Sequence, residues 1–405
     1  MLNKNINNFF FILFSIIPIS VLIGPAVSLL NILLIDFCFL ALIIFKKNYS
    51  FLKSDVVKYL FILYVYLLFN SLISIDQKIG FFRNFGFIRF IILFAAFNYF
   101  FNQKFFLKHV LIAWSLILSF ILIDIYFEKF MGYNLAGFES PYEGRIVSFF
   151  REEPIVGGFI NSFYLIIIGF LFMNFKDFNK NYVFIFSVIF FIAILMSGER
   201  ANSIKALAGF LFFYLLIKEY NFKKKLSILI SMFLLITILV LNSQSLKSRF
   251  VYQAKHVIFE NNLYFKLYKS GLEVFKNNKV FGVGNKNYRI ETCTNKNFDI
   301  EKKDVYFCST HPHQIYIEIL AEHGIIGSIF ILFILYKIIF SKIFIVLKDR
   351  NYIQIGSLIY LILTFAPLLP SGAFFSDYML TLFMINIAIF YCSNEKLNIF
   401  YSKKL

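Results

Sequence analysis

The sequence predicts an all-α polytopic membrane protein with about twelve transmembrane helices and one large extracytoplasmic loop between the ninth and tenth helices. Two observations support this fold class. Of the 405 residues, 60% are hydrophobic and only 16% are charged, and a soluble domain of this size has too little interior to bury so many apolar side chains. The apolar residues also form runs of roughly twenty, which is the length of a helix that crosses a bilayer.

Charged residues separate these apolar runs and so define the predicted spans. A signal peptide is an alternative interpretation of residues 1–26, but Lys4 is their only early positive charge and no small-x-small cleavage site is clear. The predicted spans are 9–23, 27–45, 56–75, 85–101, 109–127, 154–174, 182–198, 201–217, 226–242, 324–346, 353–370 and 375–394.

Lysine and arginine are shared unequally between the loops, and this bias predicts the orientation of the chain. Cytoplasmic loops of membrane proteins are enriched in these residues, and placing both ends in the cytoplasm puts clusters such as Lys223–Lys225 inside. The chain then divides into helices one to nine (1–242), an extracytoplasmic loop with a histidine segment (243–323), and helices ten to twelve with a cytoplasmic tail (324–405).

The outer loop is basic, which runs against the usual charge bias. Residues 243–314 contain twelve Lys and Arg against six Asp and Glu. Two interpretations remain open: a solvated basic loop, or a receptor for an anionic lipid or phosphate headgroup. Cys293 and Cys308 share this loop in what the topology makes an oxidising space, so we expect them to form a disulfide next to His311.

Three of the five histidines lie within residues 310–327, at the start of an apolar run, and we call these residues the histidine segment. His311 and His313 flank Pro312, and proline favours the first turn of a helix. Histidine changes charge near neutral pH, which suits His313 to act as a general base. The alternative is that these side chains are simply solvated at the headgroup level.

The helix expected after His313 places three polar residues on one face. Gln314, Glu318 and Glu322 follow one another at i, i+4 and i+8, before a break at Gly324. We expect Glu318 or Glu322 to orient His313 or the helix, and we expect the substrate to contact His311, Gln314, Glu318 and Glu322. A metal site is disfavoured, because the His-Glu-x-x-His spacing is absent from the sequence and no nearby Asp completes a ligand set.

Four arginines are predicted to reach the same outer face as His313. An arginine at a membrane edge is costly, and its guanidinium binds phosphate oxygens bidentately, so each is a candidate ligand for a phosphate group. Snorkelling anchors or ordinary surface charges are the alternatives. The four residues are Arg145 and Arg151 after the fifth span, Arg200 after the seventh, and Arg249 after the ninth.

Nucleotide and acyl-transfer chemistry are disfavoured. Gly282-Val-Gly284 is typical of a turn and is not followed by Gly-Lys-Ser/Thr, so it is not a P-loop. The sequence contains no Gly-x-Ser-x-Gly nucleophile elbow. We expect no cofactor and no nucleic-acid partner.

Four segments together resemble the bacterial O-antigen ligase and O-antigen polymerase family, in that family's order. The segment 310–327 is similar to its signature, His-Asn-x-x-Leu/Tyr-x-x-Leu-x-Glu-x-Gly-x-x-Gly. Segments 144–159, 197–201 and 281–289 resemble its Arg-rich, Ser/Thr-Gly-Glu/Ser-Arg and Gly-x-Gly blocks. Gln314 departs from the pattern, because the family commonly has Asn there.

The resemblance implies a metal-independent glycosyltransferase at the periplasmic face of the bacterial inner membrane. Its donor is a glycan on undecaprenyl diphosphate. His313 matches the family's essential histidine, Arg200 its diphosphate-binding arginine, and Arg249 a further arginine by a looser match. Membrane lipids surround the protein.

The motifs do not separate a ligase from a polymerase. A ligase attaches the glycan to lipid A–core, whereas a polymerase joins repeat units on the lipid carrier. The single histidine block and the modest outer loop favour the ligase. A flippase of lipid-linked glycans is a rival, but it predicts charged residues lining a midplane cavity, often in related repeats, and the sequence shows no internal repeat.

Overall fold

The computed structural model describes residues 4–174, 180–257, 263–293 and 306–401, and these residues are mostly helical. Parts of the predicted outer loop, residues 258–262 and 294–305, lie outside the described residues. The N-terminal helices are α1 Lys4–Ser15, α2 Ile17–Ile23, α3 Pro25–Lys46, α4 Asp55–Leu72, α5 Gln77–Phe85, α6 Ile88–Phe101, α7 Lys104–Met131, α8 Val156–Asn174, α9 Lys180–Met196 and α10 Arg200–Leu216. The remaining ones are α11 Phe222–Asn242, α12 Gln244–Lys247, α13 Gln253–Lys255, α14 Leu263–Asn277, α15 Tyr288–Cys293, α16 Ile315–Ile338, α17 Ile343–Asp349, α18 Tyr352–Thr364 and α19 Asp377–Cys392.

The helices confirm a polytopic α-helical membrane protein. Seven helical stretches are long and apolar enough to cross a membrane, and the bent pair α1 and α2 gives an eighth if it forms one span. Helices α9, α18 and α19 are shorter apolar helices of 10–17 residues. Each predicted span overlaps a helix, while the count of twelve remains a prediction. The predicted run 353–370 is too long, because α18 ends at Thr364, and Pro367 disfavours helix at the residue before it.

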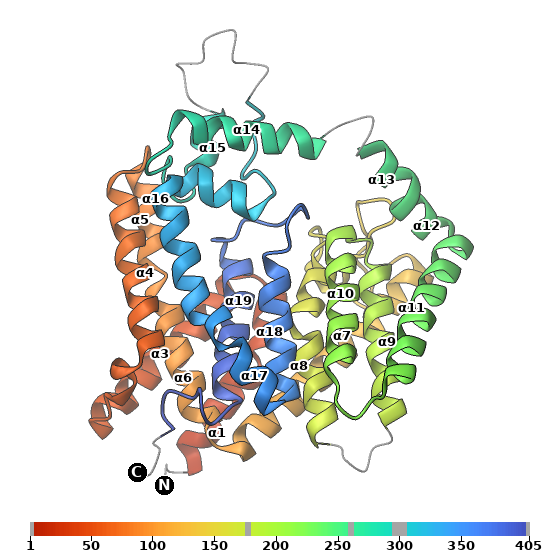
Figure 1. The fold of residues 1–405 in the computed structure, drawn as a ribbon, viewed down its shortest axis with the longest axis horizontal. Helices are drawn as coiled ribbons and strands as arrows, with labels where there is room; N and C mark the ends of the chain where they lie inside the picture. The colour runs from red at the N-terminus through yellow and green to blue at the C-terminus, as the bar shows by residue number, and fades with distance from the viewer. Residues whose placement is uncertain (1–3, 175–179, 258–262, 294–305, 402–405) are drawn as a thin grey trace.

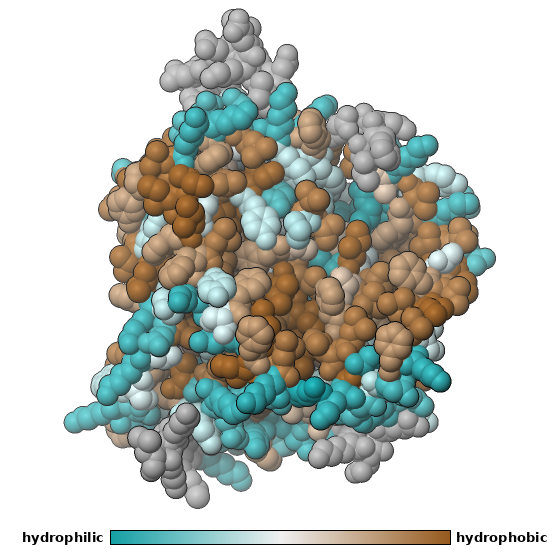
Figure 2. Space-filling view, viewed as in Figure 1, coloured by the Kyte–Doolittle hydropathy of each residue, from teal (hydrophilic) through white to brown (hydrophobic). Residues whose placement is uncertain are grey.

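The two ends of the helix bundle are distinct. The chain termini lie at one end, and α14 and α15 cross the other (Figure 1). A hydrophobic band separates hydrophilic surfaces at the two ends (Figure 2). Ion pairs join loops that the topology predicts to be cytoplasmic: Lys104–Glu395 at 3.1 Å, Lys180–Glu219 at 3.7 Å and Lys396–Asp349 at 2.5 Å. We call this the inner end and the opposite one the outer end.

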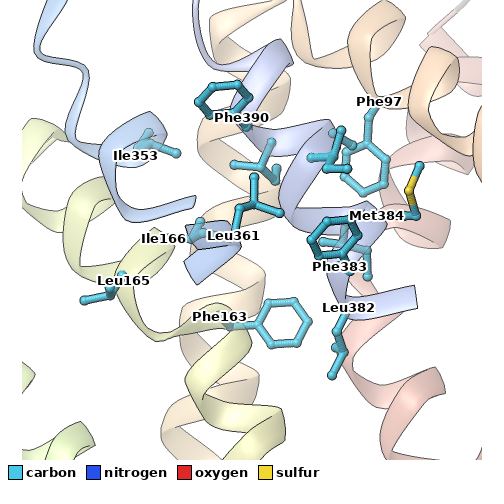
Figure 3. Close-up of a cluster of buried hydrophobic side chains, with 14 of the residues drawn as sticks. Phe97, Phe163, Leu165, Ile166, Ile353, Leu361, Leu382, Phe383, Met384 and Phe390 are labelled. Carbon is cyan, nitrogen blue, oxygen red and sulfur yellow. The ribbon is translucent and has the colours of Figure 1, made fainter. Parts of the chain in front are cut away.

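The core lies where α6, α8, α18 and α19 pack together. Helices α8 and α18 approach so closely that a Cβ atom on Gly169 would overlap the carbonyl of Tyr352, and one on Gly356 would overlap that of Leu165. Small residues at such positions let helix backbones approach within a membrane. Buried side chains of these helices interdigitate (Figure 3), among them Phe97, Phe163, Leu361 and Phe383. This core holds rigid the helix ends that support the outer surface.

Short helices and loops build the outer end. Cys293 at the end of α15 and Cys308 form a disulfide with a Cα–Cα distance of 4.8 Å. Cys38 in α3 and Cys392 in α19 are free. The disulfide links the end of α15 to the residues that immediately precede the histidine segment.

Candidate functional site

Gln314 fixes the point at which α16 begins. Its side-chain oxygen accepts a hydrogen bond from the backbone N–H of Ile317 at 2.9 Å, so Gln314 is the N-cap of the helix. This corrects the expectation that Gln314 lies on a helix face with the two glutamates. Asn is a preferred N-cap residue, and Gln reaches the same N–H with one more methylene. The side-chain oxygen of Gln314 therefore bonds to its own helix, and its predicted contact with substrate stays a prediction.

His313 adopts a strained backbone conformation immediately before that cap. Its φ is 55°, in the left-handed region, where a non-glycine residue costs on the order of 1–3 kcal/mol. The loop between α18 and α19 holds it there, because the N–H of Ser371 donates to the His313 carbonyl oxygen at 2.9 Å. Such strain persists only where the surroundings fix the residue, and the position of the imidazole is therefore set by two separate segments.

His311 packs behind His313. The two rings lie 4.0 Å apart between centroids. Nε2 of His311 is 3.2 Å from the Ser371 carbonyl oxygen, and Nδ1 is 2.9 Å from the Thr310 hydroxyl. With both ring nitrogens occupied and the side chain buried, these contacts favour a supporting role for His311 over the predicted contact with substrate.

Burial keeps both histidines uncharged. Desolvation lowers the pKa of His313, and it lowers the pKa of His311 to about 3, with His313 adding to the effect. A neutral imidazole has one nitrogen with a free lone pair. His313 is therefore in the protonation state that a general base requires at neutral pH.

The two glutamates of α16 contact backbone groups of other segments. Both carboxylate oxygens of Glu318 lie 3.1 Å from the N–H of Phe374, and Glu322 accepts from the N–H of Tyr288 at 3.4 Å. Among the contacts of the described residues neither carboxylate bonds to His313, and both join α16 to other segments, as the alternative that they orient the helix expects. Their side chains are buried, and they fix the chain on either side of the histidine segment.

The Gly-x-Gly block stabilises the break in α16. Gly324 has φ 63° and ψ −169°, which interrupts the helix and frees backbone groups at the membrane edge. Residues 279–284 run beside 321–326 and satisfy these groups, as buried backbone requires. The four hydrogen bonds are Val283 N–H to Ala321 O (3.0 Å), Gly284 N–H to Glu322 O (2.9 Å), Ile325 N–H to Lys279 O (2.8 Å) and Ile326 N–H to Val280 O (3.3 Å).

Three of the predicted arginines meet at the outer end, and we call Arg145, Arg200 and Arg249 the arginine cluster. Nε of Arg249, in the π-helical turn Ser248–Tyr252, donates to the Gly198 carbonyl oxygen at 2.8 Å. Gly198 has φ 73° and packs against the carbonyl of Gly144, where a side chain would not fit. The turn at Gly198 thus joins the segments that contain all three arginines.

The arginine cluster retains unsatisfied hydrogen-bond donors. Nη1 of Arg200 and Nε of Arg145 are buried without a partner among the described residues. The nearby carboxylate of Glu199 is occupied by the N–H groups of Gly157 and Gly158, at 2.6 and 3.1 Å, and by Asn202. Among the residues that the structure describes, none of the three arginines forms an ion pair.

The charges of the arginine cluster repel one another. Burial, together with the positive charges of Arg145 and Arg200, lowers the pKa of Arg249 to about 10. Buried donors and crowded like charges together form a site suited to an anion with several oxygens. Arg151 does not share it: this residue is exposed and lies 5.6 Å from the ring centre of Phe138.

Tyr264 lies between the arginine cluster and His313. Its ring centroid is 6.4 Å from that of the His313 imidazole, at an interplanar angle of 69°. Its hydroxyl is close enough to Arg249 to influence the pKa of that guanidinium. His313 and the arginine cluster therefore both lie close to Tyr264.

The family comparison agrees with this arrangement. Residues 185–334 match the family model described as O-antigen ligase, and the matched segment includes Arg200, Arg249 and His313. Over these residues the chain is similar to the O-antigen ligase and polymerase family. No curated protein matches it.

The similarity to the O-antigen ligase and polymerase family supports a coarse function for the protein. It is a multi-pass membrane protein with an activity of the O-antigen ligase or polymerase type, and its partners are, in general terms, a lipid-linked glycan and an acceptor. Among the described residues, no three side chains of His, Cys, Asp or Glu are grouped so that they could hold a metal ion.

Several residues of the site were missed from the sequence. Tyr264 and Tyr268 were not predicted as site residues, although their i, i+4 spacing places them on one face of a helix. Glu199 anchors the start of α8 through Gly157 and Gly158, a role that was not predicted from the sequence. The Gly-Gly pair was the available signal, because it exposes backbone N–H groups to a close acceptor.

Proposed function

We propose that this protein is an O-antigen ligase that transfers a glycan from undecaprenyl diphosphate to a hydroxyl of lipid A–core, at the periplasmic face of the inner membrane. The observation that supports it best is the arginine cluster, in which Arg200 and Arg145 have buried donors without a partner among the described residues. A diphosphate supplies oxygens for such donors, and a buried site strengthens each contact.

His313 acts as the general base in this proposal. The acceptor oxygen attacks the anomeric carbon while His313 takes the proton from the acceptor hydroxyl. The bond between the anomeric carbon and the diphosphate oxygen breaks, and undecaprenyl diphosphate leaves with the electron pair. General-base help of this kind contributes about 10²–10⁴-fold to the rate. Burial lowers the pKa of His313 and so supports the required neutral form.

The arginine cluster stabilises the charge that develops on the departing diphosphate. The turn at Gly198 holds the Arg249 guanidinium, and Arg145 and Arg200 are close enough to influence its pKa. Such preorganised cations favour the transition state without reorganisation. This role is one that divalent metal ions often fill, and we propose that the arginines fill it here.

A gel of surface glycolipids from a deletion strain tests the proposed function. The strain is complemented with wild type, His313→Ala, or His109→Ala as a matched control at a partly exposed histidine of the inner end. We expect wild type and His109→Ala to restore glycan-bearing lipid A–core. We expect His313→Ala to leave bare core, with long glycans stranded on the carrier.

Other gel patterns would overturn parts of the proposal. A full glycan ladder from His313→Ala, at normal protein level, would exclude His313 as the base. Long glycans absent from both the carrier and the core of the deletion strain would instead identify a polymerase.

A further inference from the structure

One face of α14 is directed at the histidine segment. Tyr264, Tyr268 and Gly271 follow one another at i, i+4 and i+7, so they share a side of the helix. Gly271 packs directly on Pro312, because a Cβ atom built on it would lie 2.8 Å from the Pro312 Cβ. This contact seats the helix backbone on the proline that separates the two histidines in the sequence, and it places Tyr268 one turn and Tyr264 two turns away along the same face.

The two tyrosines combine aromatic faces with an unused hydroxyl. Their ring centroids are 6.3 Å apart. The Tyr268 hydroxyl is buried and has no hydrogen-bond partner among the described residues. Burial raises the pKa of Tyr268 to about 12, so this hydroxyl keeps its proton and remains a donor. A buried donor without a partner is costly unless a ligand satisfies it.

The reaction geometry requires a sugar at this place. The transferred sugar is bonded to the diphosphate and attacked by the acceptor oxygen, so it lies between the arginine cluster and His313. Tyr264 is the side chain that faces both. The C–H faces of a pyranose are weakly positive and pack on the negative face of an aromatic ring.

We propose that Tyr264 and Tyr268 form the binding site for the carrier-proximal sugar of the donor, with Tyr264 as the stacking platform and the Tyr268 hydroxyl as a hydrogen-bond donor to a sugar hydroxyl. This inference rests on the proposed function. It adds a site that distinguishes a glycan-bearing carrier from the bare carrier, because only the former has a ring to stack.

Binding measurements with two ligands test the inference on the full chain in detergent. The ligands are undecaprenyl diphosphate and the lipid-linked glycan that accumulates in the deletion strain. We expect Tyr264→Leu to weaken binding of the lipid-linked glycan about tenfold and to leave binding of undecaprenyl diphosphate unchanged. Tyr264→Phe, which keeps the ring, should bind both ligands as wild type does.

Two further variants separate the inference from folding effects. Phe265→Leu makes the same aromatic-to-leucine change one residue along, on the exposed side of α14, and should change neither affinity. Tyr268→Phe should raise KM for the lipid-linked glycan while kcat is less affected, because it removes a binding contact and not the base. Melting temperatures of all variants should stay close to that of wild type.

The outcomes distinguish the two proposals. If Tyr264→Leu binds the lipid-linked glycan normally, or weakens both ligands equally, the sugar site is wrong. Arg200→Ala should lose affinity for both ligands, since both contain the diphosphate. If Arg200→Ala binds undecaprenyl diphosphate as tightly as wild type, the proposed function is wrong whatever the tyrosine variants show.

Discussion

The inner and outer ends of the bundle use charged side chains in opposite ways. At the inner end, lysines pair with carboxylates across loops, as in Lys104–Glu395 and Lys180–Glu219. In the arginine cluster at the outer end, the described residues provide no ion pair, and the neighbouring carboxylate of Glu199 is occupied by backbone N–H groups. Ion pairs do occur at the outer end outside the arginine cluster: Asp377 pairs with Arg83 and Arg89, and Lys276 pairs with Glu273 within α14.

The difference indicates that the paired charges of the inner end hold loops together, whereas the arginine cluster is available to bind a ligand. An exposed pair contributes little to stability and leaves no capacity for a ligand. Cations held close together without counter-charges are unfavourable in the empty protein, and the lowered pKa of Arg249 reflects this cost. Such an arrangement is expected where a ligand brings the negative charge.

The comparison is tested most strongly by exchanging arginine for lysine at each end. Arg200→Lys should lower kcat for transfer about 10²–10³-fold, because lysine keeps the charge but loses the bidentate fork that fits phosphate oxygens. Arg350→Lys, the same change at an exposed position of the inner end, should leave transfer unchanged. The measurement is the transfer rate from purified lipid-linked glycan to lipid A–core. Near-normal transfer by Arg200→Lys would refute bidentate binding of the diphosphate.

The pH dependence of transfer tests the neutral state of His313. Burial lowers its pKa below the ordinary value of 6.5, so the base form persists as the pH falls through 6.5. We expect kcat/KM to stay level through pH 6.5 and to decline only at lower pH, by about tenfold per unit once below the pKa. An acidic limb centred at or above 6.5 would mean that His313 is solvated when substrate is absent, and the structural account of its burial would fail.

Much of the fold follows from local sequence, because a span needs only a run of apolar residues of the right length. Every predicted run overlaps a helix, and the break at Gly324 falls where glycine interrupts the pattern. The run 353–370 was too long because hydrophobicity outweighed Pro367 in the prediction. That error shortened the predicted loop between α18 and α19 to residues 371–374, and the hydrogen bond from Ser371 to His313 depends on the tertiary fold.

The site was predicted in its residue types but not in its contacts. His313, Arg200 and Arg249 were singled out because charged and titratable residues are rare at the edge of apolar runs. The partners of Glu318 and Glu322 were not predictable, since Phe374 and Tyr288 lie 56 and 34 residues away along the chain. The role of the Gly-x-Gly block depends in the same way on a neighbour that only the tertiary fold provides.

The smallest expected effect comes from the inner-end pairs, and it decides whether the two ends really differ. Lys104 and Glu395 lie 3.1 Å apart with side chains that are 89% and 52% exposed, so solvent screens their attraction. Lys104→Gln should change the free energy of unfolding by less than about 1 kcal/mol and leave transfer intact. Thermal unfolding and the transfer assay measure both quantities. A large loss of transfer in Lys104→Gln would show that charge at the inner end also serves the reaction, and unpaired cations could then no longer be taken as the mark of the binding end.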